Sequence, residues 1–222
     1  MIDLSNQKPF ASGYNRDCYR HPNLPNRCLK IIRPENIQVR YQKQVTAKKL
    51  LGKSRLNDNK QEQAAHRQSA ILALISKGQE NTVWSHLPKF YGKTATSHGP
   101  ANDSELILDP SGAPGQTLEH YLRQNGFDAP IKAASARFCK WLESTNILTR
   151  NLLPHNLVIG QRNNQPELFL VDGLGAPSVQ NLLSAVPAWR ARYITRRISR
   201  FYVRITWELS DRQQSWDVSQ RL

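Results

Sequence analysis

Long apolar runs, paired cysteines and acidic residues are all scarce in this sequence of 222 residues. No stretch is long and apolar enough to span a bilayer, and the N-terminus lacks the apolar core of a signal peptide. The three cysteines, Cys18, Cys28 and Cys139, have no metal-ligand spacing, and their odd number favours a reducing compartment. These absences argue against a membrane-spanning or disulfide-stabilised protein, and we expect a cytoplasmic location.

The shortage of acids leaves a large positive charge. Only 17 Asp and Glu stand against 31 Lys and Arg, which gives a formal net charge of +14. This excess predicts an anionic partner, and charge alone leaves nucleic acid, phospholipid, phosphorylated glycan and nucleotide open. No helix-turn-helix, zinc-ligand spacing or RNA-binding signature is present, so sequence-specific nucleic-acid binding is not expected.

The segment 148–175 carries the most informative pattern. Two short apolar runs, at 157–159 and 168–171, flank a polar turn, which predicts a β-hairpin. Asn156 comes directly before the first strand and Asp172 directly after the second, so the hairpin would bring an amide oxygen and a carboxylate to the same end. Such hard oxygen ligands suit Mg²⁺, which shares its coordination shell with phosphates and water.

This pattern resembles the catalytic loop and metal-binding turn of protein kinases, where H-R-D-x-x-x-x-N precedes a hairpin that ends in D-F-G. Residues 149–156 match the loop, and Asn156 and Asp172 keep the two expected metal ligands. Asn151, however, stands where kinases carry the catalytic aspartate, and Leu153 replaces a lysine. Over its whole length the chain resembles the YrbL family, PhoP-regulatory-network proteins with a kinase-like fold.

The resemblance implies an α+β, two-lobed protein-kinase-like fold with a five-stranded antiparallel N-lobe sheet and a reduced, mostly helical C-lobe. The N-lobe would comprise residues 1–109, with helices at about 39–51 and 59–76. Residues 110–116, rich in proline and glycine, would form the hinge that holds the adenine. Residues 117–222 would form the C-lobe, which contains the catalytic-loop hairpin and a basic C-terminal helix.

Candidate phosphate ligands lie near the N-terminus. Residues 8–19 indicate two strands joined by a turn, in which Gly13 alone remains of a G-x-G-x-x-G pattern. Ser12 and Arg16 are candidate donors to a phosphate beside Gly13. An ordinary hairpin turn explains the glycine equally well.

A lysine follows in the next predicted strand, residues 27–32, whose even-numbered and odd-numbered residues face opposite sides. By the resemblance, Lys30 would hold the α- and β-phosphates, and the alternative is a solvated strand lysine. Kinases pair this lysine with a helical glutamate. Glu62 is the one acid of the helix predicted at 59–76 but lies off its apolar stripe, whereas Gln68 lies on the stripe and cannot neutralise a lysine. The sequence does not decide which of Glu62 and Gln68 faces Lys30.

Three further predictions concern the remaining elements. Residues 86–93 and 105–109 should complete the N-lobe sheet. Thr117 should cap a helix, and residues 129–142 should form a second helix behind the catalytic loop. Residues 188–209 should form one long helix in which arginines are interspersed with aromatic residues and no acid occurs from Trp189 to Trp207.

That basic helix has two interpretations. Arginine suits phosphate contacts, and aromatic rings suit a headgroup boundary, which would place the protein peripherally at the inner face of the membrane. A helix that packs on the core with a solvated basic face is equally consistent with the sequence.

Three functions fit these features. The first is a weak phosphotransferase that uses ATP and Mg²⁺ on a hydroxyl of a protein or of a glycan-linked or lipid-linked acceptor. Its catalytic loop would use Arg150 as a brace, Asn151 and His155, and the missing aspartate predicts weak or no activity, since general-base help is typically worth about 10²–10⁴-fold. The second is a pseudokinase that binds nucleotide and regulates or scaffolds a partner. The third is a binding module for an anionic surface, such as a membrane, lipopolysaccharide or nucleic acid. The ordered set Lys30, Asn156 and Asp172 favours the first two.

Overall fold

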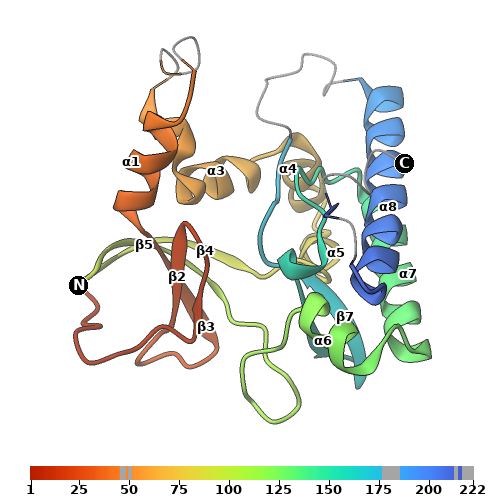
Figure 1. Ribbon diagram of the computed structural model, residues 1–222, viewed down its shortest axis with the longest axis horizontal. Helices are drawn as coiled ribbons and strands as arrows, with labels where there is room; N and C mark the ends of the chain where they lie inside the picture. The colour runs from red at the N-terminus through yellow and green to blue at the C-terminus, as the bar shows by residue number, and fades with distance from the viewer. Residues whose placement is uncertain (46–48, 50–51, 177–185, 213–214, 217–222) are drawn as a thin grey trace. The chain divides into compact units, whose positions relative to one another are not determined.

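The structure, a computed structural model, describes residues 1–45, 49, 52–176, 186–212 and 215–216. The chain divides into two compact units. The sheet unit contains residues 1–66 and 89–106, and the helical unit contains residues 67–88 and those described after 106. A five-stranded antiparallel sheet forms the first, and the second has most of the helices together with a two-stranded hairpin (Figure 1). The predicted α+β class with a five-stranded antiparallel sheet is confirmed.

The strand order of the five-stranded sheet is β1-β2-β3-β5-β4, and every neighbouring pair is antiparallel. The strands are β1 Ala11–Ser12, β2 Arg16–Arg20, β3 Arg27–Ile32, β4 Phe90–Thr96 and β5 Gly99–Glu105. The strands predicted within residues 8–19 and at 27–32 are therefore confirmed.

The prediction of a last strand at 105–109 is wrong, because β5 ends at Glu105. This strand reads Gly-Pro-Ala-Asn-Asp-Ser-Glu and lacks the apolar alternation by which strands are found. Its polar side chains are nevertheless buried: Asn102 is 0% exposed and Ser104 is 3% exposed. Hydrogen bonds from the Asn102 amide to Asn59 O and Glu62 Oε2 replace apolar contacts there.

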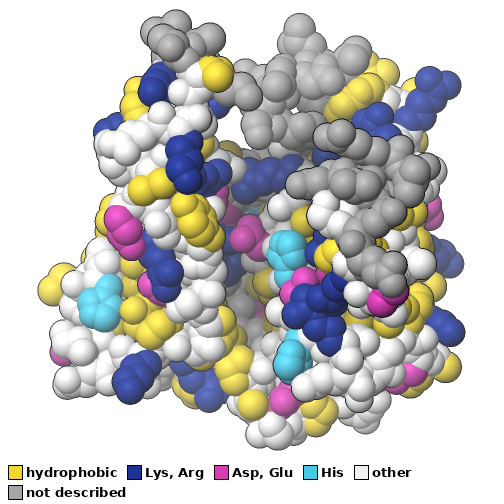
Figure 2. Space-filling view, viewed as in Figure 1, with side chains coloured by type: hydrophobic (Ala, Val, Ile, Leu, Met, Phe, Trp, Pro, Cys, Tyr) yellow, Lys and Arg dark blue, Asp and Glu magenta, His cyan; other side chains and the backbone are white. Residues whose placement is uncertain are grey.

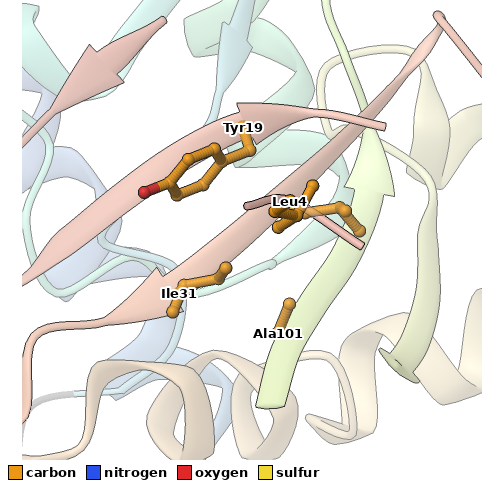
Figure 3. Close-up of a cluster of buried hydrophobic side chains, with 5 residues drawn as sticks. Leu4, Tyr19, Ile31 and Ala101 are labelled. Atoms are coloured by element: carbon orange, nitrogen blue, oxygen red, sulfur yellow. The ribbon is translucent and has the colours of Figure 1, made fainter. Parts of the chain in front are cut away.

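One face of the sheet packs into an apolar cluster and the other into a polar one. Leu29 and Ile31 of β3 join Leu4, Tyr19 and Ala101 in the apolar cluster (Figure 3). The opposite face, which includes Lys30, lies against helix α3 (Asp58–Ala65), whose Asn59 amide donates to Lys30 O at 2.8 Å. The alternation predicted for this strand is confirmed.

The first predicted helix begins earlier than expected. Helix α1 spans Pro34–Gln42, because proline is favoured in the first turn of a helix. A short 3₁₀ helix, η1 (Lys53–Leu56), precedes α3. Residues 46–48 and 50–51, the remainder of the helix predicted at 39–51, lie outside the described residues.

The single helix predicted at 59–76 is wrong, since α3 and α4 (Ser69–Ser76) are separate helices in different units. Between them Gln68 has an extended backbone, and its Oε1 accepts a hydrogen bond of 2.7 Å from Leu148 N. Trp141 Nε1 likewise donates to Thr82 O, within α5 (Glu80–Trp84), at 2.6 Å. Residues 67–88 thus belong to the helical unit, whereas the prediction assigned them to the N-lobe.

The other elements of the helical unit are η2 Pro154–Asn156, β6 Leu157–Arg162, β7 Gln165–Leu170, α6 Leu118–Asn125, α7 Ala129–Thr145 and α8 Pro187–Leu209. Thr117 caps α6 by accepting from His120 N at 3.2 Å, as predicted. The predicted hairpin is also confirmed, with a tighter turn in which Asn163 and Asn164 have φ of 51° and 59°. Helix α8 packs against α6 and α7 (Figure 1).

Two further features concern the cysteines and the apolar content of the helices. The three cysteines are free thiols. None of the helices in the described ranges combines the length and the apolar content that a bilayer span needs.

Candidate functional site

Lys30 forms a buried ion pair with Glu62 in the sheet unit. Lys30 Nζ lies 2.5 Å from Glu62 Oε1, and the two residues are 6% and 9% exposed. The Asn102 amide donates to Glu62 Oε2 at 3.0 Å. Glu62 is therefore the partner of Lys30, and Gln68 instead bonds to the backbone of Leu148 in the helical unit. The alternative prediction, that Lys30 is a solvated strand lysine, is wrong.

A second cation, Arg16, shares the same carboxylate. Arg16 Nη1 lies 2.6 Å from Glu62 Oε2 and 3.4 Å from Asn59 Oδ1, and the residue is 6% exposed. The β2–β3 register explains this contact, since Cys18 lies opposite Lys30 and Arg16 is two residues away on the same face. The Arg16 guanidinium, which the sequence analysis named as a candidate donor to a phosphate, therefore forms an ion pair with Glu62.

Competing effects set the pKa values on this face. Burial raises the pKa of Glu62, but the charges of Lys30 and Arg16 outweigh it and hold that pKa well below its usual range. A hydrogen bond from Cys28 lowers the pKa of the Cys18 thiol to about 7, and Lys30 and Arg16 act in the same direction against burial. This group of side chains has a net positive charge, because the single carboxylate of Glu62 pairs with two cations, Lys30 and Arg16.

The turn that precedes β2 has fewer phosphate-binding features than a glycine-rich loop would have. Ser12 is exposed, and its hydroxyl donates to Asp17 Oδ1 at 2.6 Å. Gly13 N donates to Arg16 O at 2.8 Å, and a Cβ added at Gly13 would lie 3.6 Å from that oxygen, an ordinary contact. The turn therefore does not require glycine at this position, which fits an ordinary hairpin.

The helical unit carries the predicted metal ligands at one end of the β6–β7 hairpin. Val171 N donates to Asn156 O at 2.9 Å, which places Asp172 next to the partner of Asn156. The Asn156 side chain is buried, and its Nδ2 donates to Asn151 O at 2.9 Å. This bond fixes the orientation of the amide and ties Asn156 to the residue in the position of the catalytic base.

Gly173 joins the predicted catalytic loop to the predicted metal-binding turn. Its carbonyl accepts hydrogen bonds of 2.8 Å from both Thr149 Oγ1 and Arg150 N, and its N donates to Asp172 Oδ1 at 2.6 Å. Gly173 has φ of 81°, and an added Cβ would lie 2.6 Å from Asn151 O. Close approach and a left-handed backbone both require glycine here.

We expect Gly173→Ala to destabilise the protein by about 2 kcal/mol or more, because a left-handed alanine costs about 1–2 kcal/mol and its methyl also displaces the loop. Gly78→Ala is the matched control: Gly78 has φ of 70° in the same unit, but no atom lies within 4 Å of its added Cβ. Urea unfolding of both variants measures the difference. Equal destabilisation would contradict the contact between the two loops.

The remaining predicted catalytic residues stand on the same segment. Asn151 and His155 are exposed, and Arg150 is half-buried with its backbone bound to Gly173. Within the described ranges, no group of three or more His, Cys, Asp and Glu is placed to hold a metal ion. One carboxylate with one amide still fits Mg²⁺ that arrives with a nucleotide, since Mg²⁺ is usually bound by one or two carboxylates plus phosphates.

Helix α8 contacts the loop that was predicted to be catalytic, and the sequence did not reveal this contact. Arg197 Nε donates to the Tyr193 hydroxyl at 2.9 Å, and that hydroxyl donates to Thr149 O at 3.0 Å. Trp189 stacks on the Tyr193 ring with centroids 5.0 Å apart. The alternation of aromatic and basic residues was visible in the sequence, but no local pattern indicates which of them contact a loop more than forty positions away.

Comparison with solved structures finds protein kinase domains. A mutant of the Mycobacterium tuberculosis PknI kinase domain has a TM-score of 0.39 at 13% identity, and the match covers 76% of this chain and 59% of that chain. A double mutant of that domain has a TM-score of 0.38 at 12% identity, with the same coverage. The chain spans about three fifths of these structures.

Sequence comparison gives matches over most of the chain. The YrbL proteins of Escherichia coli (strain K12) and Shigella flexneri are each 25% identical over 211 residues, which cover 92% of this chain and 86% of theirs. The family profile described as PhoP regulatory network protein YrbL matches residues 2–210. Because that match takes in both units and nearly every described residue, the chain belongs to the YrbL family.

Proposed function

We propose that the protein binds ATP together with Mg²⁺. The observation that carries this proposal is the Lys30–Glu62 ion pair, 2.5 Å long and buried. An ion pair is costly to bury, so it is weak evidence of a role in stability. In protein kinases the same pairing, strand lysine with helix glutamate, must be in place for the lysine to act on the nucleotide phosphates.

The helical unit would supply the metal ligands. Asn156 and Asp172 are the residues that would hold Mg²⁺, which when bound neutralises charge on the phosphates. The hydrogen bond from Asn156 Nδ2 to Asn151 O limits the rotation of the amide that would supply its oxygen to the metal. Gly173 N holds one oxygen of Asp172 and so limits the rotation of that carboxylate. Both side chains are therefore oriented before a ligand arrives.

Phosphoryl transfer to a hydroxyl acceptor, protein or glycan-linked or lipid-linked, is the further part of the proposal. Transfer depends mostly on positioning and charge neutralisation, which the loop geometry supports. An amide at Asn151 cannot accept a proton from the acceptor, so we propose a slow enzyme. A pseudokinase that binds nucleotide and regulates a partner is the second candidate, favoured by the same residue. A cytoplasmic location stays a prediction.

Saturating ATP with Mg²⁺ should raise the melting temperature. At 100-fold excess over Kd, binding stabilises a protein by about 2.7 kcal/mol, which corresponds to about 5–10 °C for a chain of this size. Asp172→Ala should abolish the shift that Mg²⁺ adds, because it removes the one carboxylate of the metal pair. Differential scanning fluorimetry with ATP, with and without Mg²⁺, measures both effects.

Asp3→Ala is the matched control, since it removes an exposed carboxylate and changes the net charge equally. It should keep the full nucleotide shift. The melting temperature of each variant without nucleotide shows whether its fold is intact. If Mg²⁺ and ATP stabilise neither the wild type nor the control, the protein is not a nucleotide binder.

A further inference from the structure

Helix α8 has one face in the core and one face outside. Its inward residues Tyr193, Ile194, Phe201 and Ile205 are all buried. Figure 2 shows Lys and Arg side chains at the right-hand edge of the molecule, where Figure 1 places α7 and α8. The core-packing interpretation of this helix therefore accounts for the inward face and leaves the outward face to be explained.

Three arginines follow one another along the outward face in a row that winds slowly around the helix. Arg192, Arg196 and Arg200 are exposed and recur every fourth residue, so the row extends over about 12 Å of helix. No acid occurs between Trp189 and Trp207. The next acid, Glu208, points inward, where it lies 2.7 Å from Arg204 Nη2 and 2.5 Å from Arg212 Nη2. The row is thus a cationic strip without an interspersed carboxylate of its own helix.

An exposed apolar side chain shares this face. Val203 is 49% exposed and falls in line with Arg192 and Arg196 at helical spacing. A solvated basic face would not need an apolar residue within its row of charges.

We propose that the outward face of α8, formed by Arg192, Arg196, Arg200 and Val203, docks on a membrane surface that contains anionic phospholipid. Arginines bind the phosphate groups, while the valine contacts the acyl boundary beneath the headgroups. A nucleic-acid backbone would satisfy the arginines but would leave the aliphatic side chain without a partner. Val203 therefore favours lipid, and attachment is peripheral because the buried face of α8 remains in the protein core.

The site is independent of nucleotide binding but adjacent to the loop that we assign to it. Arg197 and Tyr193, on the inward side of the same helix, hold Thr149 O through the two hydrogen bonds described above. Docking would consequently act on the helix that supports the catalytic loop. Failure of lipid binding and failure of nucleotide binding are separately measurable.

The test is co-sedimentation with vesicles of phosphatidylcholine alone or with 30% phosphatidylglycerol. We expect binding to the anionic vesicles only, weakened steeply by salt because exposed charges are screened. Each basic residue near an anionic surface contributes about fivefold in affinity. The variant Arg192→Glu/Arg196→Glu/Arg200→Glu should therefore lose about 100-fold or more in affinity for the anionic vesicles, and its melting temperature without vesicles shows whether its fold is intact.

A second triple variant controls for net charge. Lys77, Lys89 and Lys93 are exposed and belong to other elements than α8, and Lys77→Glu/Lys89→Glu/Lys93→Glu changes the net charge by the same amount. It should keep most of the vesicle binding. Equal loss in both triple variants, or no binding of the wild type to anionic vesicles, would overturn the proposal. Binding to single-stranded nucleic acid but not to vesicles would overturn it in favour of the other polyanion.

Discussion

Glu62→Gln is expected to destabilise the protein by about 3–5 kcal/mol at neutral pH, the usual cost of removing one partner from a buried ionic group. Glutamine keeps the size of the side chain and can still accept the hydrogen bond from Asn102, so the change isolates the charge. Arg16 and Lys30, each 6% exposed, would then remain buried without the carboxylate that both contact. A loss of that size is a large part of the stability of an ordinary domain.

The loss should depend on pH in a defined direction. The pKa of Glu62 is well below its usual range in the folded protein, whereas in the unfolded chain it is about 4.3. A lowered pKa in the folded state means that its contribution to stability is complete above the unfolded pKa and decreases as the pH falls below it. The difference between wild type and Glu62→Gln should therefore be largest near pH 7 and smaller near pH 3.5.

Urea unfolding at the two pH values measures both effects. Asp17→Asn is the control, because Asp17 of the same sheet pairs with Arg33 at 2.5 Å but the two side chains are 20% and 33% exposed. It should cost about 1 kcal/mol or less, as is typical of partly exposed pairs. A Glu62→Gln variant as stable as this control would contradict the buried three-charge group.

A third variant separates the fold from the function. Replacement of a whole buried ionic group by apolar residues is often neutral or stabilising. Arg16→Met/Lys30→Met/Glu62→Met should accordingly recover most of the stability that Glu62→Gln loses. It should nevertheless show no melting shift with ATP and Mg²⁺, because the proposed phosphate ligand is gone. A full shift would remove Lys30 from the proposed site.

The sequence predicted well those elements whose residues alternate or repeat within one short window. Strand β3 and the β6–β7 hairpin show a period of two, and α8 shows a helical repeat over its whole length. Asn156 and Asp172 could be found because they immediately flank the hairpin strands, so local structure alone brings them to one end. Lys30 could be found because it interrupts an apolar strand.

The sequence could not identify the partner of Lys30, because the predicted helix that carries Glu62 was too long. The apolar stripe used to judge Glu62 belongs to α4, which lies in the other unit. Within α3 alone, Asn59, Glu62 and Ala65 recur every third residue and are the buried ones. Strand β5 was missed for a related reason: its buried residues are polar and hydrogen-bonded, so the hydrophobic pattern that marks a strand is absent.

Asn151→Asp is expected to raise the rate of phosphoryl transfer about 10²-fold or more, up to about 10⁴-fold, the usual worth of a general base. The backbone of residue 151 is held in place independently of its side chain. Asn151 N lies 3.3 Å from Gly173 O, and Asn151 O accepts from Asn156 Nδ2 at 2.9 Å, so backbone contacts fix the residue whatever its side chain. Aspartate has the same size as asparagine, and the residue is exposed, so neither clash nor burial opposes the new carboxylate.

The measurement is release of labelled phosphate from ATP with Mg²⁺ under single-turnover conditions, with water as the acceptor. Asn151→Ala is the control, and it should match the wild type because an amide contributes no base. Asn151→Asp/Asp172→Asn should lose the gain, since the new carboxylate acts only on a nucleotide whose phosphates are neutralised by the metal. If Asn151→Asp binds ATP with Mg²⁺ as the wild type does and is no faster, the loop does not position an acceptor. Nucleotide-dependent regulation of a partner would then be the function that the same residues support.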